Sequence, residues 1–328
     1  MIRREIGRNG REVNAVGLGC MGMSIAYGPA METADAVKLL HEAIELGVDH
    51  FDTAEMYGLG ANETLLGHAF HDRRDKVFIA TKFGPIYDPA VGTFATVDGS
   101  EANARRAVEA SLRFLKTDNI DLYYLHRRDL TRPIEETVGA MAKLVAEGKI
   151  KAIGLSEVSA ETLKAAQAVH PIAAVQSEYS IFSRDLEADV LPQCQAGGTT
   201  LVAYSPLGRG MLGGTFSRDQ RPAATDYRTA MSPRWQGEAF EANLALVEEV
   251  HAVAKACGVE PSQVALAWLL AKPGVVAIPG TTKLANLKSN LGGADVVLSE
   301  ADTARLNALA DKVQGQRYDE AGMKRINV

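Results

Sequence analysis

The stretch FDTAEMYG (residues 51–58) gives the first indication of the fold, because an apolar run ends there in polar side chains. Residues 48–52 are typical of a short buried strand, and Glu55 and Tyr57 follow Asp52 closely. In proteins built on parallel strands, functional groups collect at the carboxyl ends of those strands. The stretch therefore predicts a parallel strand whose carboxyl end contributes to a site.

Seven further short apolar runs occur along the chain, and helical patterns separate them. They are apolar along their whole length, as strands covered on both faces are. These runs are residues 15–18, 77–82, 120–125, 152–156, 173–177, 200–204 and 275–279. Together the eight runs predict an α/β protein with a (β/α)8 TIM barrel.

The helices are predicted from apolar residues at helical spacing and from residues that start or stop helices. Thr33 is a candidate cap and Gly47 a stop, and Pro133 fits the first position of another helix. Ser159 is a candidate cap for a further helix. Other predicted helices cover residues 62–70, 100–115, 185–196, 239–256, 261–272 and, as an extra C-terminal helix, 299–313.

Three further features complete the predicted organisation. The segments RREI and REVNAV around GRNG predict an N-terminal β-hairpin, which we place at the lower end of the barrel. Residues 213–233, rich in Gly, Pro, Arg and Thr, predict a long loop. We expect residues 1–328 to form a single domain, since no boundary or low-complexity tract interrupts the alternation of strands and helices.

The composition excludes several classes of protein. A net charge of −6 and a pI near 5.7 argue against a nucleic-acid partner. No apolar run is long enough for a membrane span, and the start of the chain lacks the apolar region of a signal peptide. The 3 cysteines are far apart, with no metal-ligand spacing. We expect a cytoplasmic protein without a metal, and the sequence leaves open whether it forms a homo-oligomer.

GLGCMG (residues 17–22) matches the glycine pattern of dinucleotide-binding Rossmann units. In those units a helix opens directly after the glycines. Here the next helical pattern begins only near Thr33. We interpret the glycines as a tight turn after the first strand, and approach of their backbone to a ligand stays open.

Polar side chains end three successive predicted strands, in FDTAEMY, IATKFG and YYLHRRD. Neighbouring strand ends meet on one face of a barrel, so Asp52, Lys82 and His126 should converge, with Tyr57 above Asp52. Taken singly, a lysine at a strand end is usually a solvated charge and a lone histidine a core residue. Four such groups on three adjacent strand ends predict an active site.

This set of side chains suits proton transfer to an oxygen atom. A free tyrosine has a pKa near ~10, and a nearby ammonium such as that of Lys82 should lower it. Asp52 can serve as the counter-ion of a buried Lys82. His126 can hold a carbonyl oxygen by a hydrogen bond. The sequence predicts a general acid, Tyr57, with the groups that tune it.

The motifs FDTAEMYG, TKFG, YYLHR, GLSE, AYSPLGRG and IPGTT resemble, in order and spacing, those of the aldo-keto reductase family. The resemblance is closest to the bacterial and plant branch and covers nearly the whole chain. It implies a (β/α)8 barrel that binds NADPH without a Rossmann fold and reduces aldehydes and ketones to alcohols. It also implies that Tyr57 is the general acid, that Lys82 and Asp52 tune it, and that His126 orients the carbonyl.

The same resemblance implies the residues that bind the cofactor. Nicotinamide would stack on Tyr204, with Ser156 and Gln176 on its carboxamide. Glu157 stands where the family often has asparagine. The full implied set is Ser156, Gln176, Tyr204, Ser205, Leu207, Gly208, Arg209, Gly210, Gly280, Thr281, Thr282, Lys283 and Asn290.

Two of these segments also predict phosphate sites from their residues. SPLGRG (residues 205–210) offers small residues and the charge of Arg209 to a pyrophosphate. In IPGTTK a strand ends, hydroxyls follow, and a helix begins with Lys283 in its first turn, which suits the 2′-phosphate of NADPH. Many relatives have arginine at position 286 and glutamate at position 289, where this chain has Asn286 and Ser289. Lys288 is interpreted as a solvated charge that could compensate.

The resemblance makes a small carbonyl compound the expected substrate of an NADPH-dependent reductase. The candidate pocket wall, for which packing in the scaffold is an equal interpretation, is Met21, Met23, Tyr27, Met56, Trp235 and Tyr318. One alternative is a redox-sensing regulatory subunit that binds NADP(H) with little turnover, disfavoured because no partner-binding extension precedes the first hairpin. A barrel hydrolase that uses Asp52, Glu55 and His126 is a second alternative, but it leaves Tyr57 and Lys82 unexplained.

Overall fold

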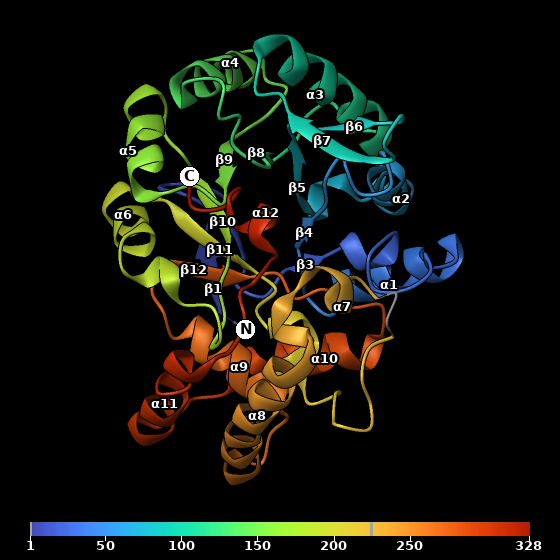
Figure 1. Cartoon of the computed structure of the whole chain (residues 1–328). Helices are drawn as coiled ribbons and strands as arrows, with labels where there is room; N and C mark the ends of the chain where they lie inside the picture. The colour runs from blue at the N-terminus through green and yellow to red at the C-terminus, as the bar shows by residue number, and fades with distance from the viewer. Residues whose placement is uncertain (1, 224–225) are drawn as a thin grey trace.

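The computed structural model describes residues 2–223 and 226–328 and contains a ring of eight parallel strands with helices outside it (Figure 1). Neighbouring strands pair in the order β12-β11-β10-β9-β8-β5-β4-β3. The strands are β3 (Leu18–Gly19), β4 (His50–Asp52), β5 (Phe78–Phe83), β8 (Leu122–Leu125), β9 (Ile153–Ser156), β10 (Ala174–Glu178), β11 (Thr200–Tyr204) and β12 (Val275–Ala277). The predicted (β/α)8 fold is confirmed. Seven predicted strands overlap these elements over most of their length, whereas the run over residues 15–18 shares only Leu18 with β3.

The ring closes between its first and last strands. Parallel bridges join Val16 to Ala277 and Gly19 to Gly280. A Cβ atom on Gly19 would lie 2.9 Å from the carbonyl oxygen of Ile278, so a larger residue would push the two strands apart. No α-helix follows the glycines of residues 17–22, since α1 starts only at Thr33. Gly17 and Gly19 therefore lie at the closure of the barrel, and Gly22 lies in the 3₁₀ turn Met21–Met23 after β3, which agrees with the predicted turn.

The helices alternate with the strands in the predicted order. The α-helices are α1 (Thr33–Glu45), α2 (Ala61–Phe70), α3 (Glu101–Leu115), α4 (Ile134–Ala146), α5 (Ala160–Val169), α6 (Val190–Gly197), α7 (Tyr227–Met231), α8 (Gly237–Cys257), α9 (Pro261–Leu270), α10 (Leu284–Gly292), α11 (Glu300–Asn307) and α12 (Glu320–Met323). Shorter 3₁₀ turns cover Met21–Met23, Arg74–Lys76, Asp185–Glu187, Gly208–Gly213, Pro233–Trp235, Gly293–Asp295 and Ala310–Lys312. No described helix combines the length and the apolar content that a membrane crossing requires.

Capping side chains start two of the predicted helices. The hydroxyl oxygens of Ser100 and Ser159 each accept a hydrogen bond from a backbone N–H in the first turn of α3 and α5. Pro133 instead lies one position before the helix, as the N-cap residue of α4. The predicted helix over residues 185–196 is divided into a 3₁₀ turn and α6. The predicted loop over 213–233 contains α7, and its residues 224–225 lie outside the described residues.

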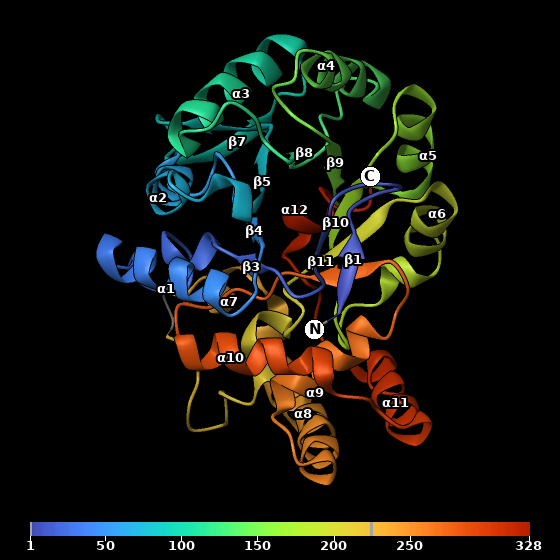
Figure 2. The same ribbon diagram turned by 180° about the vertical axis from the view of Figure 1, so that it is seen from behind.

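The N-terminal hairpin of β1 (Arg3–Glu5) and β2 (Glu12–Asn14) covers the mouth at the amino ends of the strands (Figure 2). Arg4 donates from Nη1 to the carbonyl oxygen of Val275, and the N–H of Gly7 donates to Thr200 Oγ1. Because Thr200 and Val275 begin β11 and β12, the hairpin lies at the predicted lower end. A second hairpin, β6 (Pro85–Asp88) with β7 (Thr93–Val97), follows β5 and was not predicted.

Glu63 of α2 is a fully buried carboxyl group that gives the fold a pH dependence. Its Oε1 accepts a hydrogen bond of 2.6 Å from Thr81 Oγ1, and its Oε2 has no partner among the described residues. Burial raises the pKa of Glu63 to about 7, against the opposing effect of the Thr81 hydrogen bond. In the unfolded chain the group ionises near its usual pKa of ~4.3. The folded state therefore loses stability as the pH rises from about 4 to 7.

We expect Glu63→Gln to remove this loss, because glutamine keeps the acceptor for Thr81 but cannot ionise. The free energy of unfolding should rise by up to about 3 kcal/mol at pH 8 and by much less at pH 5. Urea denaturation at the two pH values measures both. The control is Glu45→Gln, because Glu45 is exposed. Its effect on the free energy of unfolding should be the same at pH 5 and pH 8. An equal effect of Glu63→Gln at pH 5 and pH 8 would contradict a raised pKa for this group.

Candidate functional site

Four polar side chains meet at the carboxyl ends of β4, β5 and β8, as the sequence predicted. Lys82 Nζ lies 2.5 Å from Asp52 Oδ1, 2.7 Å from the carbonyl oxygen of Thr53 and 3.4 Å from the hydroxyl of Tyr57. The rings of Tyr57 and His126 pack edge to face with centroids 5.8 Å apart. Lys82 is completely buried beneath the other three. The arrangement is a phenol with a buried ammonium–carboxylate pair behind it and an imidazole beside it.

The ionisation of Tyr57 differs from the expectation in direction. Burial raises the pKa of Tyr57, and Asp52 adds to this, whereas Arg127 lowers it. The expected lowering of this pKa by Lys82 is therefore not found, because desolvation disfavours a buried phenolate. The phenol stays protonated at neutral pH and holds a proton that it can donate.

The two bases beside Tyr57 are also governed by burial. Burial lowers the pKa of Lys82, while its ion pair with Asp52 raises it. Burial, Lys82 and Arg127 together hold the pKa of His126 well below its usual value, so its imidazole is neutral. His126 Nδ1 has no hydrogen-bond partner among the described residues. A neutral imidazole can donate one hydrogen bond to a substrate oxygen.

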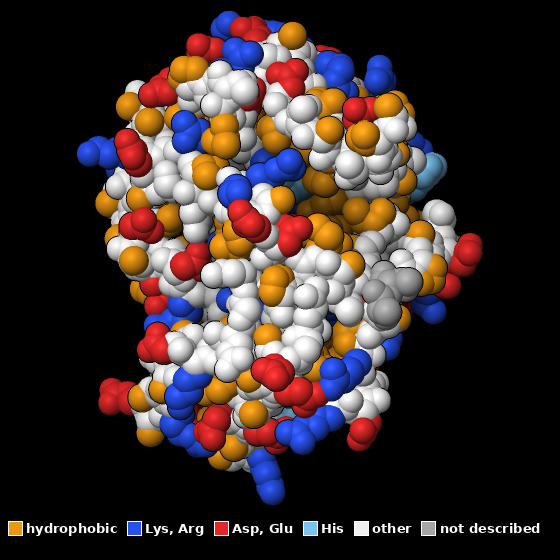
Figure 3. Space-filling model, viewed as in Figure 1, with side chains coloured by type: hydrophobic (Ala, Val, Ile, Leu, Met, Phe, Trp, Pro, Cys, Tyr) orange, Lys and Arg blue, Asp and Glu red, His pale blue; other side chains and the backbone are white. Residues whose placement is uncertain are grey.

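The four groups lie at one end of a cavity of about 960 Å³, and a hollow lined with hydrophobic side chains is visible on this face (Figure 3). Three of them, Asp52, Tyr57 and His126, line the cavity, and Lys82 lies behind it. The implied cofactor residues that line it are Ser156, Gln176, Tyr204, Ser205, Leu207, Arg209, Gly210, Gly280, Thr281, Thr282, Lys283 and Asn290. Gly208 is the implied cofactor residue that does not line it.

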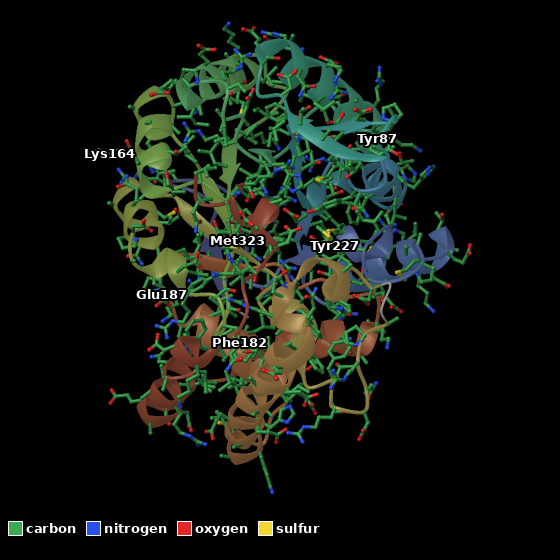
Figure 4. All side chains as sticks on the ribbon, in the orientation of Figure 1. Tyr87, Lys164, Phe182, Glu187, Tyr227 and Met323 are labelled. Carbon is green, nitrogen blue, oxygen red and sulfur yellow. The ribbon has the colours of Figure 1, made fainter. Side chains whose placement is uncertain are left out.

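Four of the six residues expected in the pocket wall line the cavity. Met21, Tyr27, Met56 and Tyr318 line the cavity. Met23 and Trp235 do not, and they are interior packing residues. Tyr227 is another lining residue, and Figure 4 labels it together with Met323 of the tail helix α12.

Arg209 is held by protein partners rather than standing free for a phosphate. Its Nη2 lies 3.0 Å from Glu178 Oε2, and its guanidinium lies 4.5 Å from the ring centroid of Tyr318. The backbone of Arg209 is in the left-handed region, with a φ of 59°. Arg209 Nη1 is buried and has no hydrogen-bond partner among the described residues.

Glu157 connects the C-terminal tail to the cavity. Its carboxylate accepts hydrogen bonds from the Tyr204 hydroxyl at 2.7 Å and from Arg317 at 3.2 Å. The Tyr204 hydroxyl is also 2.8 Å from that of Tyr318. Two hydrogen bonds thus fix the ring of Tyr204. The Glu157 carboxylate also holds the C-terminal tail, through Arg317, at the carboxyl ends of the strands.

The far end of the cavity is formed by the start of α10. The Lys283 N–H donates to Thr281 Oγ1 at 3.1 Å, and the Lys283 side chain is exposed at the helix start. Asn286 and Ser289 line the same end, whereas Lys288 is exposed and does not. Glu260, which was not predicted as a site residue, also lines this cavity.

Other lining residues were missed as well, chiefly Arg127, Phe216, Tyr227 and Arg228. Arg127 directly follows His126, and that adjacency was the signal available in the sequence. The remaining three belong to the long loop after β11, whose composition indicates only a loop. Among the described residues, no three His, Cys, Asp or Glu side chains cluster as metal ligands.

The fold and this site define a known family. A model of the aldo/keto reductase family matches residues 15–311, and the chain belongs to that family, whose members catalyse the oxidoreduction of carbonyl compounds. A thermostable aldo-keto reductase solved with the inhibitor epalrestat is 35% identical, with a TM-score of 0.77, 94% of this chain and 100% of that chain being covered.

Two further solved structures are similar. An aldo-keto reductase from Klebsiella pneumoniae in complex with NADPH is 30% identical, with a TM-score of 0.75 and coverage of 97% and 99% of the two chains. The glycerol dehydrogenase of Gluconobacter oxydans is 28% identical, with a TM-score of 0.86 and coverage of 97% of each chain.

Proposed function

We propose that this chain reduces aldehydes or ketones to alcohols with NADPH, and that Tyr57 donates the proton. The observation that supports this most strongly is the protonated Tyr57 phenol beside the buried Lys82–Asp52 pair, facing a cavity with a neutral His126. Bound NADPH would supply the hydride. The donor set contains no activated nucleophile, which leaves proton donation as the chemistry that it suits.

The side chains around the carbonyl would act together. His126 would donate a hydrogen bond to the substrate oxygen, which holds the carbonyl near Tyr57. The Tyr57 hydroxyl would give its proton to that oxygen as negative charge develops there. Lys82, fixed by Asp52 and the Thr53 carbonyl, would stabilise the phenolate that remains.

The residues of the cavity fit NADPH. Tyr204 offers a ring fixed by two hydrogen bonds for the nicotinamide, and Ser156 lines the same cavity. Gln176 donates to Asp52 Oδ2 at 2.7 Å, which leaves its carbonyl oxygen for a carboxamide. Ser205–Gly210 and Gly280–Lys283 would hold the phosphates. The Klebsiella pneumoniae relative was solved with NADPH, which supports this choice.

We also propose that residues 1–328 act as one domain. Tyr318 of the tail lines the cavity, and Arg317 is bonded to Glu157 directly after β9. Removing the tail should therefore disturb the site itself.

A screen for carbonyl-dependent oxidation of NADPH tests the proposed function. The expected result is turnover of at least one aldehyde or ketone from a chemically varied panel. Tight NADPH binding without turnover of any carbonyl would indicate a redox-sensing role instead. Hydrolysis of esters or amides without any cofactor would indicate the barrel hydrolase.

Charges at the start of α10 should set the preference between NADPH and NADH. Lys283 favours the 2′-phosphate, whereas Glu260 places a carboxylate in the same cavity. We expect Lys283→Ala to weaken NADPH binding by about 10- to 100-fold with little effect on NADH, because only NADPH carries that charge. Glu260→Gln should strengthen NADPH binding by a few-fold. Quenching of protein fluorescence on titration with NADPH and with NADH measures the affinities of the unaltered protein and of both variants.

Lys288→Ala is the matched control, because Lys288 is an exposed lysine of the same helix outside the cavity. It should change neither affinity appreciably. The effect of Lys283→Ala should shrink as salt is added. Equal weakening of NADPH and NADH by Lys283→Ala would mean that Lys283 supports the pyrophosphate or the helix.

A further inference from the structure

Arg127 is a half-buried cation in the cavity wall without a matching anion. Its Nη1 donates to the carbonyl oxygen of His126 at 2.6 Å and to Ser156 Oγ at 3.2 Å. Its Nε and Nη2 donate to no described residue, and no described carboxylate lies within ion-pair distance of it. The two hydrogen bonds from one nitrogen fix the guanidinium and leave its other donors unused.

The other two arginines that line the cavity are neutralised. Arg209 is paired with Glu178 at 3.0 Å, and Arg228 with Asp226 at 2.7 Å. Glu157, at the end of β9, is engaged by Arg317 and by the Tyr204 hydroxyl. Burial disfavours the Arg127 cation, whereas Tyr204, Tyr318 and Glu157 raise its pKa from a distance. None of them forms an ion pair with it, so a ligand carboxylate could pair with its unused N–H donors.

The position of Arg127 separates it from the proposed phosphate-binding segments. Those segments follow β11 and β12, whereas Arg127 follows β8, and β9 and β10 lie between them in the sheet. Arg127 adjoins His126, which we assign to the substrate carbonyl. Met21, Met56 and Phe216 are among the hydrophobic residues that line the same cavity.

Resting on the proposed function, we propose that Arg127 binds a carboxylate of the substrate and that the chain prefers oxo acids, aldehydes or ketones that carry a carboxylate near the carbonyl. The planar guanidinium presents parallel N–H donors that match the two oxygens of a carboxylate. The carboxylate would supply the missing counter-ion. His126 and Tyr57 would meet the carbonyl of the same molecule.

The test compares oxo acids with their uncharged methyl esters at saturating NADPH. Suitable pairs are glyoxylate, 4-oxobutanoate and 4-carboxybenzaldehyde, each with its ester. For at least one pair we expect kcat/KM to favour the acid by about 10-fold or more. Arg127→Met should lower that acid-to-ester ratio by about 10- to 100-fold, mainly through KM, and Arg127→Lys should lower it less.

Arg128→Met is the matched control. Arg128 is the next residue in the chain, donates to Thr162 Oγ1 at 2.8 Å and does not line the cavity. It should leave the acid-to-ester ratio unchanged. A second readout is calorimetric titration of the protein with benzoate, a carboxylate that cannot be reduced. Arg127→Met should weaken benzoate binding at least 10-fold.

The outcomes are distinguishable from a failure of the proposed function. Turnover of the esters with no preference for any acid would overturn the carboxylate site and leave carbonyl reduction standing. A loss of acid and ester turnover by the same factor in Arg127→Met would assign Arg127 to positioning Ser156 instead. If neither these acids and esters nor any carbonyl of the varied panel is reduced, the proposed function fails, and the benzoate titration alone decides whether Arg127 binds a carboxylate.

Discussion

Replacing Tyr57 with phenylalanine should lower kcat for carbonyl reduction by about 10²- to 10⁴-fold, the usual contribution of a positioned proton donor. The substitution removes one hydroxyl and keeps the ring that packs against His126. NADPH binding should stay nearly unchanged, since Tyr57 is not assigned to the cofactor. Stopped-flow measurement of NADPH oxidation, with a separate titration of cofactor binding, gives both quantities.

Tyr123→Phe is the control for the loss of a buried tyrosine hydroxyl. Tyr123 lies in β8, and its hydroxyl has no hydrogen-bond partner among the described residues. It does not line the cavity, so its variant should turn over substrate like the unaltered protein. Near-normal turnover by Tyr57→Phe would remove Tyr57 from its assigned role.

Lys82→Met should have the second largest effect, a loss of turnover on the order of 10²-fold. It removes the ammonium behind Tyr57 and leaves the Asp52 carboxylate buried without its cation, which raises the pKa of Tyr57 further. Asp52→Asn should be milder, because Lys82 keeps the Thr53 carbonyl as a partner. Steady-state kcat at saturating NADPH compares the two variants.

Breaking a buried ion pair also costs stability, about 3–5 kcal/mol. Thermal unfolding of each variant should therefore accompany the kinetics, so that a loss of folded protein is not counted as a loss of chemistry. The double variant Asp52→Asn/Lys82→Met leaves no unpaired charge and should be more stable than Lys82→Met alone. A greater kinetic loss for Asp52→Asn than for Lys82→Met would show that Asp52 acts directly on the substrate.

The strands and the convergence of the four polar groups could be predicted because they follow from local patterns. Strands covered on both faces leave a continuous apolar run, and the polar residue that ends each run marks the carboxyl edge. Asp52, Lys82 and His126 are such residues, and the barrel topology alone brings them together. The second hairpin lacked this signal, since β7 is mostly exposed and alternates little.

The electrostatics of the site could not be predicted, because they depend on partners from distant segments. Arg209 was assigned to a phosphate, but Glu178 holds one side of it. Glu157 accepts from Arg317, which is 160 positions away in the chain. The direction of the Tyr57 pKa depends on how deeply the phenol is buried, and no spacing of residues records that.

Transfer of deuterium from NADPH labelled on the C4 position of its nicotinamide tests carbonyl reduction most directly. The protein, the labelled cofactor and a reactive aldehyde are incubated, and the alcohol is analysed by mass spectrometry. We expect one deuterium on the carbinol carbon with the unaltered protein and almost none with Tyr57→Phe over the same time. Saturable NADPH binding with no deuterium in any alcohol, across the whole carbonyl panel, would contradict a reductase and leave a cofactor-binding sensor.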